Sequence, residues 1–279
     1  MLRRALMWVA MAAGVAAMSQ VPVAVAEPAE EAPESAVSSP PMEMDDPGTP
    51  GHRGLEINFV GGREKIGLSK RMEVLLDANY GIGDRIQLKY ERPYVSLEEE
   101  DVPHQNGLGA TEVGIKWRMV DHNGLGIAFY PNYQMDDSFK LSDVNGEPIE
   151  SEGRSVYLPL LMSEEVAHLY TLAANIGYRR NLQHRGDDIN IAFGAGRAVP
   201  GDGRVLAEVF SERDESLHNR QTDVRVGYVF NVLPKSWVPH QMEFPVYVSY
   251  GHSIGATEET EPATSVVFGV SVIKLPAGE

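Results

Sequence analysis

Charged and amide side chains recur at every second position along much of this chain. Full charges of both signs on one face of an extended segment can pair with one another and fill a narrow interior. They can also line a hydrated path, or a polar floor beneath a substrate pocket. Mixed signs favour pairing over ion selection, and both interpretations stay open. The candidate residues of this lumen or substrate path are Glu56, Asn58, Asp77, Asn79, Lys89, Glu91, Glu112, Lys116, Arg118, Arg179, Glu208 and Arg225.

A second pattern concerns nucleophilic catalysis. Ser249, His252 and Ser253 lie close together in sequence and could serve a lipid hydrolase at the rim of a barrel. Such chemistry requires a nucleophile, a base and an orienting group within mutual reach, and the spacing leaves that geometry undetermined. We therefore expect no catalytic residues and no enzyme, with a rim-active lipid hydrolase as the least favoured alternative.

Metal binding is not favoured either. Acidic runs at residues 98–101, 136–137 and 258–261 could supply carboxylates to calcium, but no 12-residue EF-hand pattern is present. The eight histidines are scattered, without the pair spacing of a zinc site. We expect solvated loop charge, no metal and no cofactor.

The elements that carry the polar residues are strands. Between Val74 and Pro93, apolar residues alternate with polar ones on both sides of a Gly-rich turn, and a period of two is typical of a β-strand. The same period predicts twelve strands, at about 54–62, 72–80, 84–93, 109–120, 124–133, 154–162, 167–180, 187–198, 204–212, 219–231, 243–252 and 263–274. The chain is therefore predicted to be all-β.

The predicted connections alternate in length. The first, over residues 62–71, and most of the other odd-numbered connections are long, whereas the even-numbered ones are mostly short. A membrane barrel has short periplasmic turns and longer extracellular loops. The tenth connection, over residues 232–242, is too long for a tight turn, so either a strand is misplaced or the periplasmic turn is extended. Pro131, Pro159 and Pro245 predict bulges or strand ends.

Strand length and aromatic placement favour a membrane barrel over a soluble one. Segments of about ten residues match an oblique bilayer crossing, and aromatic residues gather near strand ends. We predict an antiparallel transmembrane β-barrel of about twelve strands, with an apolar outer face and a polar lumen. A soluble exported barrel that binds a ligand is the alternative.

The N-terminus predicts export. Arg3 and Arg4 precede an apolar run that ends in a small-residue cleavage site at Ala26, so residues 1–26 are predicted to be a signal peptide. Residues 27–44 are rich in Pro, Ala and Glu and are predicted to be a disordered linker, and residues 45–279 form the barrel domain. The outer membrane is the expected location.

Composition limits the partners. Of the 24 basic residues two lie in the signal peptide, so the remaining 22 face 40 acidic residues, a net charge of −18. This charge disfavours nucleic acid. The chain has no cysteine, so no disulfide stabilises the exported product. The expected partners are outer-membrane lipid, the barrel-insertion machinery and a small solute, and we expect a monomer.

Part of the chain resembles a known family. The residues that carry the resemblance are Asp45 to Gly51, Glu56 to Asn58, Leu76 to Asp84, Gln87 to Glu91 and Gly114 to Arg118. They are similar to bacterial exported proteins labelled as meta-pathway phenol degradation proteins, often called simply transporters. The resemblance covers roughly residues 45–120. It implies an outer-membrane barrel associated with uptake of aromatic or other apolar compounds, and it implies no catalytic residues.

Taken with the strand pattern, the resemblance predicts a passive channel or transporter for small apolar or aromatic solutes. A structural barrel with a plugged lumen remains the principal alternative.

Overall fold

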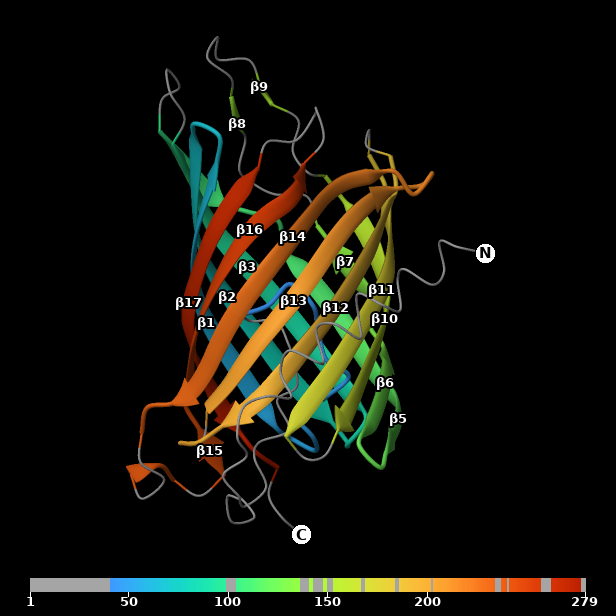
Figure 1. The fold of residues 1–279 in the computed structure, drawn as a ribbon, viewed down its shortest axis with the longest axis vertical. Helices are drawn as coiled ribbons and strands as arrows, with labels where there is room; N and C mark the ends of the chain where they lie inside the picture. The colour runs from blue at the N-terminus through green and yellow to red at the C-terminus, as the bar shows by residue number, and fades with distance from the viewer. Residues whose placement is uncertain are drawn as a thin grey trace, which may run out of the picture. The chain divides into compact units, whose positions relative to one another are not determined.

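A computed structural model describes residues 41–98, 104–135, 141–142, 148–149, 153–166, 169–183, 186–201, 203–233, 237–239, 241–256 and 262–276. Its regular elements are strands (Figure 1). Those that form the barrel wall are β1 (Leu55–Ile66), β2 (Ser69–Ile82), β3 (Ile86–Glu98), β5 (Glu112–His122), β6 (Leu125–Phe129), β7 (Asn132–Gln134), β10 (Ser155–Val166), β11 (Tyr170–Asn181), β12 (Asp188–Val199), β13 (Gly203–Asp214), β14 (Asn219–Asn231), β16 (Pro245–Ala256) and β17 (Ala263–Lys274). Short strands β4 (Gln105–Leu108), β8 (Leu141–Ser142), β9 (Pro148–Ile149) and β15 (Met242–Glu243) lie in the connections.

The sheet closes on itself. Each wall strand pairs antiparallel with its neighbours in sequence, and β1 pairs with β17 from Leu55↔Lys274 to Ile66↔Ala263. Because β6 and β7 share the position between β5 and β10, the ring has twelve strands. The predicted fold and strand number are confirmed. Within the described ranges, no helix has the length and apolarity needed to cross a bilayer.

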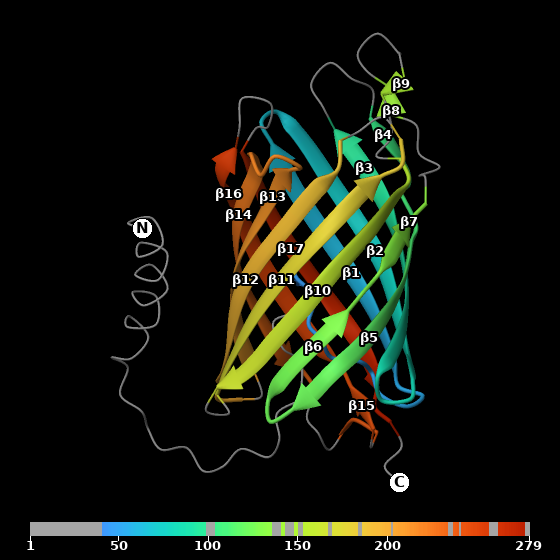
Figure 2. The same cartoon turned by 90° about the vertical axis from the view of Figure 1, so that its right-hand side faces the viewer.

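Two of the three prolines coincide with strand ends, as expected. Pro131 lies in the break between β6 and β7, and Pro245 begins β16. Pro159 lies inside β10, opposite that break, because β10 pairs with β7 through Tyr157 and with β6 from Leu160 onward. Figure 2 shows β6 and β7 in line between β5 and β10. Pro159 has no backbone N–H to donate, and it therefore lies where the hydrogen-bond ladder between the strands is already interrupted.

The two ends of the barrel differ. At one end, here called the turn rim, residues 83–85, 123–124 and 200–202 join successive strands. The other end, the loop rim, carries the longer connections over residues 99–111 and 135–154. The tenth connection is an extended excursion at the turn rim, where β15 pairs with the end of β17. It contains the exposed Trp237.

One predicted connection is wrong. Residues 62–71 were expected to form a long loop, but β1 and β2 pair continuously up to Ile66↔Ser69. The turn is only Gly67 and Leu68, and Gly67 adopts the left-handed φ of 55° that favours glycine. The hairpin continues beyond the apolar part of the strands, where alternation disappears from the sequence.

The faces of the barrel are inverted relative to a soluble one. Outward side chains such as Phe59, Trp117 and Phe268 are 51%, 52% and 59% exposed. Asn58, Asp77 and Lys116, on the opposite face, are buried. A continuous apolar outer face belongs in lipid, as in outer-membrane barrels. The arrangement contradicts the alternative of a soluble barrel with charges outside.

The first described residues lie inside the barrel. Residues 41–54 precede β1 and cross the lumen (Figure 1, blue), and we call them the lumen strap. Pro41, Met44 and Pro47 are among the most deeply buried side chains. Residues 27–40 of the linker predicted over residues 27–44 lie outside the described residues. The last four residues of the linker are packed in the lumen, contrary to expectation. The barrel wall buries them, whereas a segment of their composition cannot bury itself.

Candidate functional site

The lumen strap runs from the middle of the barrel to the turn rim. It begins at Pro41, against β14 and β16, and ends where the chain enters β1. Near the turn rim, Thr49 Oγ1 donates to the carbonyl of Asp84 (3.0 Å), and the backbone N–H of Gly81 donates to Gly54 (3.0 Å). A Cβ at Gly81 would lie 1.7 Å from the carbonyl oxygen of Gly51, so only glycine admits the strap here.

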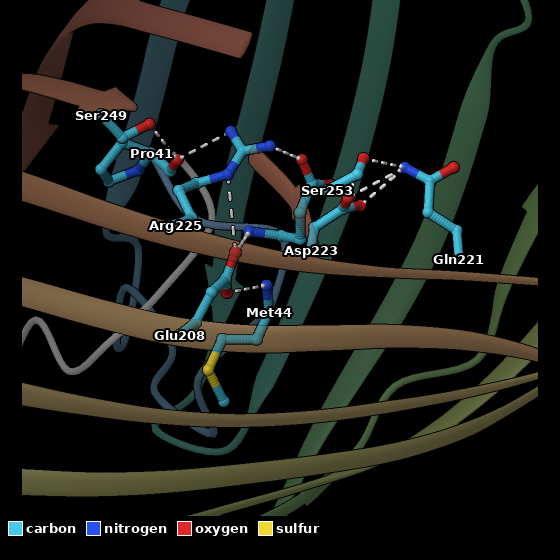
Figure 3. A network of polar contacts seen from close by, with 9 residues as sticks. Pro41, Met44, Glu208, Gln221, Asp223, Arg225, Ser249 and Ser253 are labelled. Carbon is cyan, nitrogen blue, oxygen red and sulfur yellow. Dashed lines mark hydrogen bonds and ion pairs between the residues drawn. The ribbon is translucent and has the colours of Figure 1, made fainter. Parts of the chain in front are cut away.

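The centre of the strap is held by a cluster of polar side chains on the wall. The backbone N–H groups of Glu43 and Met44 donate to the two carboxylate oxygens of Glu208, at 2.8 and 3.1 Å. The carbonyl of Pro41 lies between Ser249, which donates at 2.9 Å, and Arg225, at 3.4 Å (Figure 3). Hydrogen bonds to a buried carboxylate are stronger than those between neutral groups.

Arg225 connects the wall to the strap. Its Nη2 donates to the Glu43 carboxylate, and its Nε lies 3.6 Å from Oε1 of Glu208. Glu208 and Arg225 were both predicted to face the lumen, and the structure brings them together. Their shared partner is the strap, which the sequence interpretation did not include.

The strap also buries apolar side chains. Met42 and Met44 pack in a cluster with three small or medium side chains of the wall, Ala173, Ala192 and Leu206. Phe210 and Val229 pack against the edge of this cluster. Burying a methionine side chain in such a pocket contributes about 1.5–3 kcal/mol. The wall thus has an apolar patch inside a polar lumen, and the strap packs against this patch.

Toward the turn rim, the wall carries a network of buried amides and carboxylates. Asp77 accepts from Nδ2 of Asn58 (2.8 Å) and of Asn79 (3.1 Å), and Gln87 donates to Asn79 at 2.6 Å. Asn58 also donates to Glu56 (3.0 Å) and accepts from Ser271. Four predicted site residues therefore meet in one network. It fills the interior between neighbouring strands.

Two lysines extend this network toward the strap. Lys116 donates to the carbonyl of Asp46 at 2.8 Å, and Lys89 pairs with Glu91 at 2.8 Å. Both ammonium groups lie over the ring of Tyr130, at 5.1 and 5.8 Å from its centroid. A tyrosine face attracts cations, so Tyr130 separates two positive charges that would otherwise repel.

The remaining predicted residues are more dispersed. Glu112 pairs in register with Glu91, on the lumen face. Arg179 donates to Gln134 (3.0 Å) and stacks over Tyr157.

Arg118 lies at the turn rim rather than deep in the lumen. It donates to the carbonyl of Asp84 (2.8 Å) and pairs with Asp121 (3.1 Å). All twelve predicted residues are thus described, and whether a solute passes them stays a prediction.

An open cavity lies on the loop-rim side of the strap. Its volume is about 520 Å³, and its lining includes Pro41, Met42 and Glu43 of the strap. We call it the outer cavity. Three arginines line it, Arg63, Arg71 and Arg225. Its carboxylates are twice as many, namely Glu43, Glu64, Glu73, Glu91, Glu212 and Asp223. Acidic side chains therefore outnumber basic ones in its lining by two to one.

The structure does not bring the predicted hydrolase residues together. Ser249 donates to the strap, and Ser253 donates to Asp223 at 2.6 Å. His252 is exposed and its Nδ1 lies 3.1 Å from Oγ1 of Thr264. Among the described residues, no group of three or more His, Asp or Glu side chains could hold a metal. The acidic runs at residues 136–137 and 258–261 lie outside the described residues, as do residues 99–101.

Sequence reasoning missed the strap itself and its partners Asn175 and Ser249. Asn175 donates to the carbonyl of Asp45 at 3.0 Å. The available signal was the alternation Met42-Glu43-Met44 at the end of a Pro-rich segment. Two apolar residues around an acid suggest a short extended segment with one buried face.

The fold defines the class. A closed twelve-stranded barrel with an apolar exterior and a polar lumen is an outer-membrane type of β-barrel.

Solved structures of this class are similar to the chain. The NanC porin matches with a TM-score of 0.56 at 9% identity, over 79% of this chain and 100% of that one. An outer-membrane channel from Pseudomonas putida F1 matches at 0.53 and 10% identity, over 79% and 94%. The KdgM porin in complex with disordered oligogalacturonate matches at 0.51 and 11% identity, over 77% and 97%. At these identities the likeness extends to the fold.

No protein-family model and no curated protein matches the sequence, so the resemblance to phenol degradation proteins is not confirmed.

Proposed function

We propose that this chain is an outer-membrane channel for small polar solutes, closed at rest by the lumen strap. The observation that carries the proposal is the strap itself. It crosses a polar lumen and is held by hydrogen bonds to β5, β11, β13, β14 and β16. Contacts of this kind can be exchanged for water, so the segment can leave without breaking the barrel ladder.

The outer membrane is the proposed location. The apolar outer face and the fold of the similar porins support it. Export by the signal peptide at residues 1–26, insertion by the barrel machinery and a monomeric state complete the proposal. The absence of a nucleic-acid partner rests on the acidic charge alone.

The outer cavity supports a cationic or neutral polar solute. With six carboxylates and three arginines in its lining, it attracts cations and repels anions. A polyanion such as the oligogalacturonate of the KdgM complex would be disfavoured here. The apolar or aromatic solute predicted from the resemblance has less support, because a charged lining would have to be desolvated against it.

A permanently plugged structural barrel is the competing function. It would have the same wall and the same strap, but the strap would never leave the lumen. The two functions differ in a single observable property, the ion flux through the folded protein.

Planar-bilayer conductance tests the proposal. We expect the mature chain to show low or intermittent conductance in KCl, and a variant lacking residues 41–48 to conduct several-fold more. Faster migration of unboiled protein on a detergent gel would establish that both are folded. A matched control is Glu98→Gln, which alters only an exposed ion pair with Lys70 at the loop rim.

Equal, negligible conductance of the mature chain and the folded deletion variant would overturn the proposal. That result would instead favour a structural barrel whose wall residues close the lumen on their own.

A further inference from the structure

The inner wall around Glu208 has the properties of a peptide-binding site. Its contacts to the strap are made largely with the main chain, which any peptide presents. Glu208 accepts two consecutive backbone N–H groups, and Ser249 and Arg225 bind the carbonyl of Pro41 (Figure 3). Pairing with main-chain groups gives affinity that does not depend on the side chains of the peptide.

Further main-chain contacts continue the site along the strap. Asn175 donates to the carbonyl of Asp45 (3.0 Å), and Lys116 donates to that of Asp46 (2.8 Å). The donors come from β11, which is separated from β14 by β12 and β13, and from β5, which lies across the lumen from β14. The wall thus contacts a bent segment over six consecutive residues, 41–46.

Side-chain pockets add sequence preference. Met42 and Met44 share an apolar cluster on the wall, and Glu43 between them pairs with Arg225. The wall therefore discriminates in favour of a Met-acidic-Met sequence.

The strap shields the wall groups from water. Glu208 is 3% exposed, and its other ionic partner is Arg225 Nε at 3.6 Å. Ser249 is 2% exposed and has its hydroxyl directed at Pro41. A buried carboxylate that loses two donors is destabilised until water or another chain replaces them. A displaced strap therefore leaves donors and acceptors on the wall that water or another peptide can satisfy.

We infer that the lumen wall around Glu208 is a recognition site for peptide segments with alternating methionine and acidic residues. The lumen strap is its intramolecular ligand, and a separate peptide of the same chemistry occupies the site when the strap is absent. This inference rests on the proposed function in treating the strap as displaceable. It adds the class of ligand that closes the channel.

The test uses the variant lacking residues 41–48 and a synthetic peptide with the sequence of residues 40–48, PPMEMDDPG. Binding is measured by fluorescence anisotropy of the labelled peptide, and block by bilayer conductance. We expect saturable binding and loss of current in the deletion variant, and neither effect in the mature chain. A scrambled peptide of the same composition is expected to bind at least tenfold more weakly.

Two substitutions locate the contact. Glu208→Gln on the wall is expected to weaken binding about tenfold, because the amide presents only one acceptor oxygen to the two N–H donors. Replacing Met44 by Asp in the peptide is expected to abolish binding, and this control leaves the folded protein unchanged.

Equal binding of the scrambled peptide, or no binding at millimolar concentration, would overturn the inference. The readouts separate the two proposals. Peptide binding without any gain of conductance on strap deletion would refute the channel and leave the peptide site intact. A deletion variant that conducts but binds no peptide would refute the peptide site and leave the channel intact.

Discussion

The two halves of the lumen differ in how they use the same polar residue types. Toward the turn rim, Asn58, Asp77, Asn79 and Gln87 are buried and hydrogen-bonded to one another. Toward the loop rim, charged side chains line the outer cavity of about 520 Å³, and Arg71 pairs there with Glu73 (2.8 Å). Polar side chains in the packed half fill the interior of the barrel, as a core does. Those in the open half remain available to solvent and solute.

This difference shows that a polar lumen is not by itself a pathway. In the packed half, substitution should alter stability and leave selectivity unchanged. In the open half, it should do the opposite. The strap divides the two regions, so its substitution should alter gating.

The largest expected effect is on the stability of the packed half. Asp77→Ala removes the acceptor of Asn58 and Asn79 and leaves their amides buried without it. We expect a loss of about 2–3 kcal/mol in the free energy of unfolding. Denaturant titration of the detergent-refolded protein measures it.

The control for this substitution is Glu98→Gln, at the exposed ion pair with Lys70 (3.3 Å). It should change stability by less than about 0.5 kcal/mol, because exposed ion pairs contribute little. Equal losses for the two variants would mean that the packed network is not the core of this half.

The next effect is on the strap. Met44→Ala leaves a cavity beside Leu206 and weakens docking by about 2 kcal/mol, the lower end for a buried methionine. Because each 1.4 kcal/mol is a tenfold change in an equilibrium, the open fraction should rise by more than tenfold. Single-channel recording measures this fraction, and an unchanged open fraction would show that methionine packing does not hold the strap.

The smallest effect is on ion selectivity. Glu64→Gln with Glu73→Gln removes two of the six carboxylates of the outer cavity. In the strap-deleted channel, the cation-to-anion permeability ratio should fall a few-fold, while stability changes by less than about 0.5 kcal/mol. Reversal potentials in a KCl gradient measure the ratio. A permeability ratio that does not fall would show that the outer cavity is not part of the conduction path.

The sequence predicted the strands, because one apolar and one polar face impose a strict period of two. The direction of the faces was predicted from strand length, aromatic placement and the alternation of loop lengths. It failed at residues 62–71, where β1 and β2 continue into a hairpin around Gly67. Near the loop rim both faces of a strand meet water, so no alternation marks the pairing. Local periodicity disappears there although the ladder continues.

The candidate site was predictable only as a set of residues that share a face. That Glu208 and Arg225 face the lumen follows from alternation. Their engagement of residues 41–44 does not, since it depends on contacts between residues more than 160 positions apart in the chain. The Pro-rich composition before Met44 is also typical of a linker. Residues 41–44 are ordered only through their contacts with the barrel wall.

The position of the strap has a consequence for assembly. The segment precedes β1, yet it lies inside a ring that is closed by the pairing of the first wall strand with the last. Contacts between distant parts of a chain form late, because loop closure must precede them. A strap that docks on β13 and β14 through Glu43 and Met44 before the β1–β17 seam is complete would be enclosed as that seam forms. A segment that closes the finished barrel would also guide its construction.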